Sequence, residues 1–197
     1  MTNQQNATGA TAANINHIPF ETDAGVAHRA AIGLIVLSTD QTIEHEFRFI
    51  FKQQGVAYYE SRIPNSNRIT PETLKEMEKL IEDQTDVILQ GLPLDVVAFG
   101  CTSASMVIGE EMVFTKIRNK RPYAACTTPI TAAFAAFDAL GAKRIGVLTP
   151  YRQDINDFMR DYIAERGYEV PIFGSFNEEN DNIAARISAA SIHSAIT

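Results

Sequence analysis

The stretch "DVVAFGCTSASMVIGEE", residues 95–111, joins a continuous apolar run to a helical pattern. The run at residues 94–100 is typical of a strand that is buried on both faces. Cys101 stands where this strand ends, and ligands of parallel α/β sheets bind beyond the carboxyl ends of the strands. The stretch therefore predicts an α/β fold with Cys101 at the edge of the sheet where a site forms.

The same alternation of strand and helix continues on both sides of this stretch. Strands are expected at residues 30–37, 56–63, 94–100, 123–128, 143–151 and 168–176. Helices are expected at residues 42–55, 69–89, 104–118, 128–142 and 152–167. Pro171 suggests an edge position for the last strand, because proline lacks an N–H for the ladder. The alternation predicts a parallel, doubly wound α/β sheet.

An internal repeat divides the chain. The segments that start at Ile32 and Ile145 both run strand, polar turn, helix, glycine, strand, and their lengths match. Any two βαβ units look alike, but duplication also explains the matching length. We therefore expect two pseudo-symmetric Rossmann-like units with parallel sheets, at residues 18–125 with Cys101 and at residues 126–197. The counterpart of Cys101 would fall beyond residue 197, so we expect the C-terminal part of the second unit to be absent.

Composition excludes several classes of partner. The net charge of −7 and the pI near 5.1 argue against binding to nucleic acid or to anionic membranes. No stretch approaches the roughly 20 apolar residues of a membrane span. Residues 1–17 are polar and are expected to form a disordered lead. Two cysteines make no disulfide framework and the four histidines lack metal-like spacing, so we expect a cytoplasmic protein without a metal site.

Cys101 is the candidate catalytic residue. A thiol at the start of a helix faces free backbone N–H groups and the positive end of the helix dipole, which lower its pKa. The hydroxyls of Thr102 and Ser103 could hold a carboxylate or an enolate oxygen beside it. The pattern fits a thiol that carries a proton or acts as a nucleophile. The alternative is a buried structural cysteine, which is the interpretation we adopt for Cys126 within its strand.

Four segments carry a resemblance to a known superfamily. "VVAFGCTSAS", "IGLIVLSTDQTIEHEF", "TTPITAAFAAFDALGAKRIGVLTPY" and "GSFNEENDNIAARI" resemble the aspartate/glutamate racemase superfamily. The similar branch holds maleate cis-trans isomerases, arylmalonate decarboxylases and ectoine-utilisation (EutA) proteins, and the ectoine-utilisation proteins are the most alike. The resemblance implies an active site between two units, no metal or organic cofactor, homo-oligomers, and two facing cysteines of which Cys101 matches the first.

The resemblance also suggests residues that bind the substrate. Gln41 is placed where isomerases of this branch have an asparagine that holds a carboxylate. Asp40 departs from the family pattern, because a carboxylate there disfavours a dianion and suits an ammonium group; the alternative is a helix cap.

Further residues follow from the same resemblance. Tyr151 matches a tyrosine that donates a hydrogen bond to the substrate, although it could instead be an aromatic lid on the strand end. Thr128 could reach the same cleft or cap the next helix. Asn177 and Asn180 lie in a loop that reaches the site in relatives.

These observations predict a cofactor-independent isomerase or racemase of a small carboxylate or amino-acid-like substrate, with a place in ectoine degradation. One alternative is an arylmalonate-type decarboxylase, but those relatives have glycine where Cys101 stands. The other alternative is a ligand-binding protein without catalytic activity, or an inactive partial chain.

Overall fold

Four parallel strands form the sheet that carries Cys101 at its edge. The structure is a computed structural model that describes residues 16–197, so residues 1–15 of the expected disordered lead lie outside the described residues. The strands are β1 (Ala30–Leu37), β2 (Val56–Ile63), β3 (Val96–Phe99) and β4 (Ala125–Thr127), in the order β2-β1-β3-β4. All three pairings are parallel, which confirms the predicted α/β class.

β1 is the central strand of this sheet and the most deeply buried. Residues 31–36 are all buried, and Leu34, Ile35 and Val36 have no exposed surface. The register pairs Ile35 with Ser61 of β2 on one side and with Phe99 of β3 on the other. Because helices cover both faces of the sheet, each side chain of β1 is apolar, which explains the continuous apolar run in the sequence.

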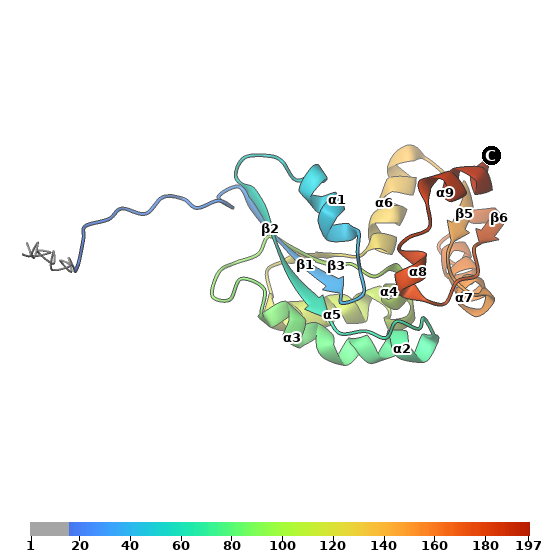
Figure 1. The fold of residues 1–197 in the computed structure, drawn as a ribbon, viewed down its shortest axis with the longest axis horizontal. Coiled ribbons are helices and arrows are strands. Elements are labelled where there is room, and N and C mark those ends of the chain that lie inside the picture. The colour runs from blue at the N-terminus through green and yellow to red at the C-terminus, as the bar shows by residue number, and fades with distance from the viewer. Residues whose placement is uncertain (1–15) are drawn as a thin grey trace, which may run out of the picture.

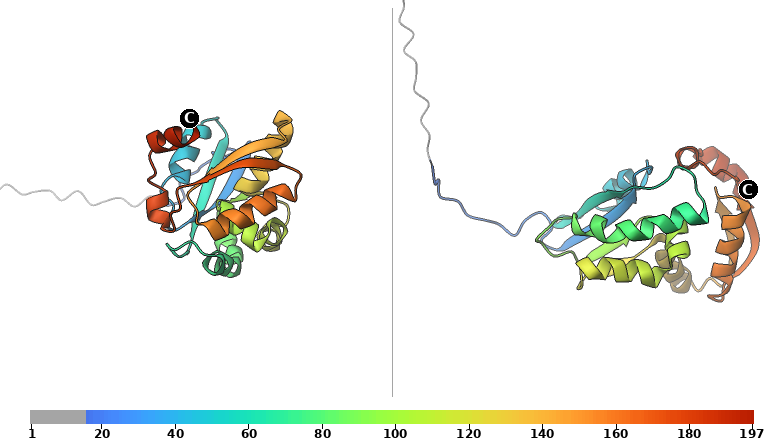
Figure 2. Two further views of the ribbon diagram at one scale, coloured as in Figure 1. Left: turned by 90° about the vertical axis from the view of Figure 1, so that its right-hand side faces the viewer. Right: turned by 90° about the horizontal axis from the view of Figure 1, so that it is seen from below.

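Helices cover this sheet unequally on its two faces. α2 (Pro71–Glu76), the 3-10 helix η1 (Met77–Leu80), α3 (Ile81–Asp86) and α5 (Glu110–Lys120) lie on one face, and α1 (Ile43–Ile50) lies on the other (Figure 1). Figure 2 shows α5 running beside the α2–α3 segment. Leu74, Met77 and Ile81, which the sequence places on one helix face, are buried in the core. Thr70 caps α2 by accepting from the Thr73 amide.

The second unit packs against the end of the first. β5 (Arg144–Thr149) and β6 (Glu169–Ser175) pair in parallel, with α6 (Pro129–Leu140), α7 (Gln153–Ala164), α8 (Asp181–Ala184) and α9 (Ala189–Ile196) around them (Figure 1). Among the described strands β6 pairs with β5 alone, so the edge position that Pro171 predicted is confirmed. Met106 of α4 (Thr102–Ile108) shares an apolar cluster with Met159 and Ile163 of α7. The helix that follows Cys101 thus belongs to the contact between the units.

Two predicted helices are interrupted. The helix expected at residues 104–118 is two helices, α4 and α5, because Gly109 adopts φ 95° and ψ 128° between them. Such a backbone conformation is open to glycine and strained for other residues. The helix expected at residues 69–89 contains the tighter turn of η1, while α8 and α9 were not predicted. In the part of the chain that the structure describes, no helix is long and apolar enough to cross a membrane.

Candidate active site

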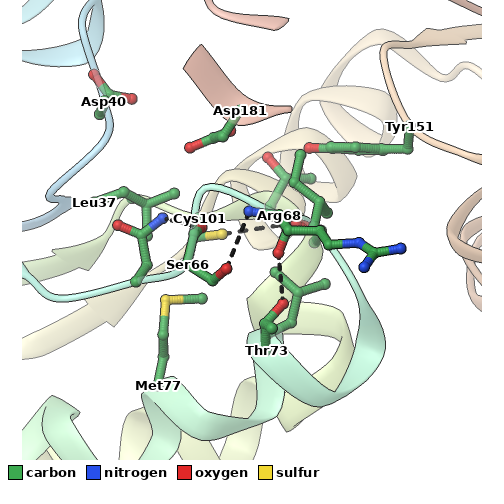
Figure 3. A pocket seen from close by; sticks show the side chains of 15 residues that line it. Leu37, Asp40, Ser66, Arg68, Thr73, Met77, Cys101, Tyr151 and Asp181 are labelled. Atoms are coloured by element: carbon green, nitrogen blue, oxygen red, sulfur yellow. Dashed lines mark hydrogen bonds between the residues drawn. The ribbon is translucent and has the colours of Figure 1, made fainter. Parts of the chain in front are cut away.

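A cavity of about 180 Å³ lies at the carboxyl ends of β1 and β3, between the two units. Figure 3 shows the side chains that surround it. Tyr151 and Asp181 come from the second unit and the other residues come from the first. The lining residues are Leu37, Asp40, Asn65, Ser66, Arg68, Ile69, Thr73, Leu74, Met77, Gly100, Cys101, Thr102, Ser103, Tyr151 and Asp181.

Cys101 lies at the point where β3 passes into α4. It is the N-cap residue of α4 and keeps an extended backbone, with φ −131° and ψ 113°. Gly100 before it donates its amide to the Ile35 carbonyl at 2.8 Å, which ties this strand end to β1. The residue is 5% exposed and its Sγ lies 3.8 Å from the Ser103 Oγ. Sequence and structure therefore agree on a thiol at the edge of the sheet, facing a cavity.

The predicted acidity of this thiol is wrong. Burial raises the pKa of Cys101 to about 11, although hydrogen bonds from the Ala104 amide and from Ser103 act to lower it. The negative charge of Asp181 raises the pKa further. The prediction considered the helix dipole and the free amides, but desolvation of the thiolate outweighs both. At neutral pH the thiol is therefore protonated.

This acidity can be measured directly. In a Cys126→Ser background, we expect the rate of Cys101 alkylation by iodoacetamide to rise about tenfold per pH unit between pH 7 and 10, because only the thiolate reacts. An unperturbed thiol levels off as the pH passes its ordinary pKa of about 8.5. Mass spectrometry of the alkylated peptide gives the rate, and circular dichroism checks the fold at each pH. A plateau below pH 9 would show that burial does not destabilise the thiolate.

Tyr151 joins the site from the second unit, directly after β5. Its carbonyl accepts a hydrogen bond from the Asn156 Nδ2 at 2.8 Å, and its amide donates to the Thr149 Oγ1 at 3.3 Å. Burial raises the pKa of its phenol, and a negative charge on Cys101 raises it further. The Ser103 hydroxyl interacts with this phenol and also with the Cys101 thiol. Tyr151 therefore presents a protonated phenol to the cavity that Cys101 also lines.

Asp40 holds the turn before α1 and also lines the cavity. Its Oδ1 accepts from the amides of Thr42 and Ile43, at 2.8 and 2.9 Å. The N-cap residue of α1 is Thr42, so Asp40 lies two residues before the cap position that the alternative interpretation gave it, although it binds the first amide of the helix. Thr102 and Ser103 also line the cavity.

Four other predicted residues lie outside the lining of this cavity. Gln41 donates from its Nε2 to the Asn182 Oδ1 at 3.3 Å. Thr128 is buried and caps α6 by accepting from the Thr131 amide at 3.2 Å. Asn177 is exposed, with φ 52°. Asn180 caps α8 by accepting from the Asn182 amide at 3.0 Å.

The loops that complete the cavity were not predicted from the sequence. Asp181 accepts a hydrogen bond from the Thr39 hydroxyl and donates its amide to the Asn67 carbonyl at 2.9 Å. Nearby, the Ile69 amide donates to the Glu179 carbonyl at 3.0 Å. These contacts join residues 178–182 of the second unit to two loops of the first. The acidic residues just before Asp181 are visible in the sequence, but only the contacts in the folded protein bring Asp181 to the cavity.

The described residues contain no group of three His, Cys, Asp or Glu side chains that could hold a metal ion. The features that define the site are a buried thiol at a strand end and a tyrosine supplied by a second α/β unit. These features define the class of the protein: two α/β units with a cavity between them that is lined by a cysteine.

Comparison with known proteins gives the family. The arylmalonate decarboxylase family model matches residues 32–195, and the chain belongs to this family. A maleate isomerase of Alcaligenes faecalis is 28% identical over 152 residues, which are 71% of this chain and 60% of that protein. A maleate isomerase of Pseudomonas putida is 26% identical over 166 residues, 78% of this chain and 65% of that protein. The chain thus spans less than two thirds of the length of these relatives.

A solved structure shares the fold. It is a cysteine-to-serine mutant of the Nocardia farcinica maleate cis-trans isomerase with a covalently bound succinylcysteine intermediate. The TM-score is 0.75 at 20% identity, and the match covers 85% of this chain and 71% of that one. The two-unit α/β architecture with parallel sheets is therefore shared with this isomerase.

Proposed function

We propose that Cys101 is the catalytic thiol of a cofactor-independent isomerase or racemase that acts on a small carboxylate. The observation that carries the proposal is the position of a buried thiol in a cavity that Ser103 and Tyr151 share with it. The maleate isomerases among its relatives, and the succinylcysteine seen in one related fold, support the same chemistry.

The cavity holds a thiol and two hydroxyl groups for a thiolate reaction, which starts once the thiol has lost its proton. In the isomerase form, the Cys101 thiolate adds to one carbon of a C=C bond and the π electron pair moves toward the neighbouring carboxylate. Rotation about the resulting single bond and expulsion of the thiolate restore the double bond in the other geometry. In the racemase form, the thiolate instead accepts the proton from the α-carbon, and the resulting enolate takes a proton from solvent on its opposite face. In this proposal the Tyr151 and Ser103 hydroxyls, which line the same cavity, stabilise the negative charge that develops on oxygen.

Narrower proposals concern the context of the reaction. The likeness of the quoted segments to ectoine-utilisation proteins supports a carboxylate from ectoine breakdown as the substrate. Two free cysteines among the described residues fit a reducing cytoplasm. The resemblance supports a homo-oligomer.

An exchange experiment tests the proposal. The protein is incubated in D₂O with EDTA and, separately, with maleate, phenylmalonate and a panel of chiral amino acids, and proton NMR follows each reaction. We expect fumarate from maleate, or deuterium at the α-carbon of an amino acid. Loss of CO₂ from phenylmalonate without either reaction would instead identify a decarboxylase. Reaction with none of the compounds, with binding of one of them, would identify a ligand-binding protein.

A further inference from the structure

We propose that Asp40 and Asp181 bind a positively charged group of the substrate, so that the Cys101 cavity takes an ammonium-bearing carboxylate in preference to a dianion of the same skeleton. This inference rests on the proposed function, because it concerns the substrate of the same cavity. Asp40 suggested such a preference from the sequence, and the structure adds Asp181 from the other unit.

The two carboxylates lie in one cavity although they come from distant parts of the chain. Asp40 follows β1 in the first unit, and Asp181 is the first residue of α8 in the second. Figure 3 shows both carboxylates above the Cys101 thiol, with Met77 and Thr73 below it. A substrate held against the thiol therefore has two acidic side chains on one side and largely neutral side chains on the other.

Each carboxylate is held in place by one of its oxygens. The Asp40 Oδ1 accepts two backbone amides, at 2.8 and 2.9 Å, and the Asp181 Oδ2 accepts the Thr39 hydroxyl. Within residues 16–197 the second oxygen of each carboxylate accepts no hydrogen bond from protein. Two anchored carboxylates therefore each keep an oxygen that a ligand N–H can use.

The described lining holds two carboxylates and one cationic side chain, Arg68. The Arg68 Nε lies 3.5 Å from the Glu179 Oε2, which also accepts from the Arg152 Nη1 at 2.8 Å. Arg62 donates to the Asp40 carbonyl at 3.2 Å, but its Nε lies 2.9 Å from the Glu44 Oε1. The balance of charge around the thiol is therefore negative, which opposes two carboxylates of a ligand and favours an ammonium group.

The charge of Asp181 also connects the choice of ligand to the pKa of the thiol. Asp181 is one of the groups that raise the pKa of Cys101 and of Tyr151. An ammonium group beside Asp181 would offset that negative charge and make the thiolate easier to form. A dianion would add to the charge, so the same residue that selects the ligand also favours reaction with it.

A matched pair of ligands tests the inference. Succinate and aspartate share a four-carbon skeleton and differ in the ammonium group, and isothermal titration calorimetry compares their affinities for the full chain. We expect aspartate to bind at least about tenfold more tightly, as opposite charges at a few ångström imply. Succinate binding equally well or better, or neither ligand binding at about 10 mM, would overturn the inference.

Variants assign the preference to the two carboxylates. Asp40→Asn keeps a side chain that can cap the helix, and Asp181→Asn keeps the size of the side chain, so both are expected to fold and to lose most of the preference. Asp181→Glu keeps the charge and should retain the preference, which guards against a general loss of fold. Asp161→Asn, on the exposed surface of α7, is the control and should leave both affinities unchanged. An unchanged preference in both Asp40→Asn and Asp181→Asn would contradict the assignment.

Turnover separates this inference from the proposed function. A preference for aspartate without any reaction would leave the inference standing and refute the enzyme. Turnover of maleate above that of every amino acid, without the preference, would refute the inference alone.

Discussion

Replacement of Cys101 by serine is expected to reduce turnover by at least about a thousandfold, the scale of loss seen when a catalytic nucleophile is removed. A serine hydroxyl is a far weaker nucleophile than a thiolate unless a base activates it. Serine is close to cysteine in size, and Cys101 already lies next to the polar Ser103, so the fold should be retained. Steady-state rates with the best substrate of the exchange panel, together with circular dichroism, measure the effect.

Cys126 provides the matched control. It lies in β4, is half-buried, and pairs in register with Val97, while its Sγ contacts the Ala124 carbonyl at 3.7 Å. It is not among the residues that line the cavity. Cys126→Ser should therefore change turnover by less than about twofold, as for a substitution outside the site. A Cys101→Ser protein that remains as active as the Cys126→Ser protein would remove Cys101 from the mechanism.

The predictable part of the fold lies where local pattern and burial agree. The run at residues 30–37 predicts a strand because each residue is apolar, and β1 is buried on both faces. Thr70 with Pro71 predicts a helix start, and the cap is present. The break at Gly109 was missed because apolar spacing continues through it, and a single glycine inside a helical pattern is often tolerated.

The predictable part of the site is the part that a strand end fixes. Cys101, Thr102 and Ser103 lie within four residues of the end of β3 at Phe99, so their place at the sheet edge follows from the order of the elements. Asp181 could not be assigned in this way, because its position depends on loop contacts with Thr39 and Asn67. The prediction of a lowered pKa for Cys101 was wrong for a related reason. The sequence shows that a helix starts beside the thiol, whereas the burial of the thiol depends on how the two units pack around it.

The structure ties Cys101 to the core through Phe99. This side chain has no exposed surface, belongs to the main apolar cluster and lies two residues before Cys101. The Phe99 carbonyl accepts the Cys101 amide at 3.0 Å. A change at Phe99 therefore acts on the stability of the fold and on the strand end that carries the thiol.

Phe99→Ala is expected to lower the free energy of unfolding by about 3–5 kcal/mol, because it leaves a cavity in a packed core. For a chain of this size the melting temperature should fall by roughly 10 °C, at about 2–4 °C per kcal/mol. Urea denaturation and thermal melts followed by circular dichroism measure both quantities. Phe20→Ala, at a side chain that is 84% exposed, is the matched control and should change the free energy by less than about 0.5 kcal/mol. If Phe99→Ala proved as mild as Phe20→Ala, β3 would not be the buried strand that holds Cys101 at the edge of the sheet.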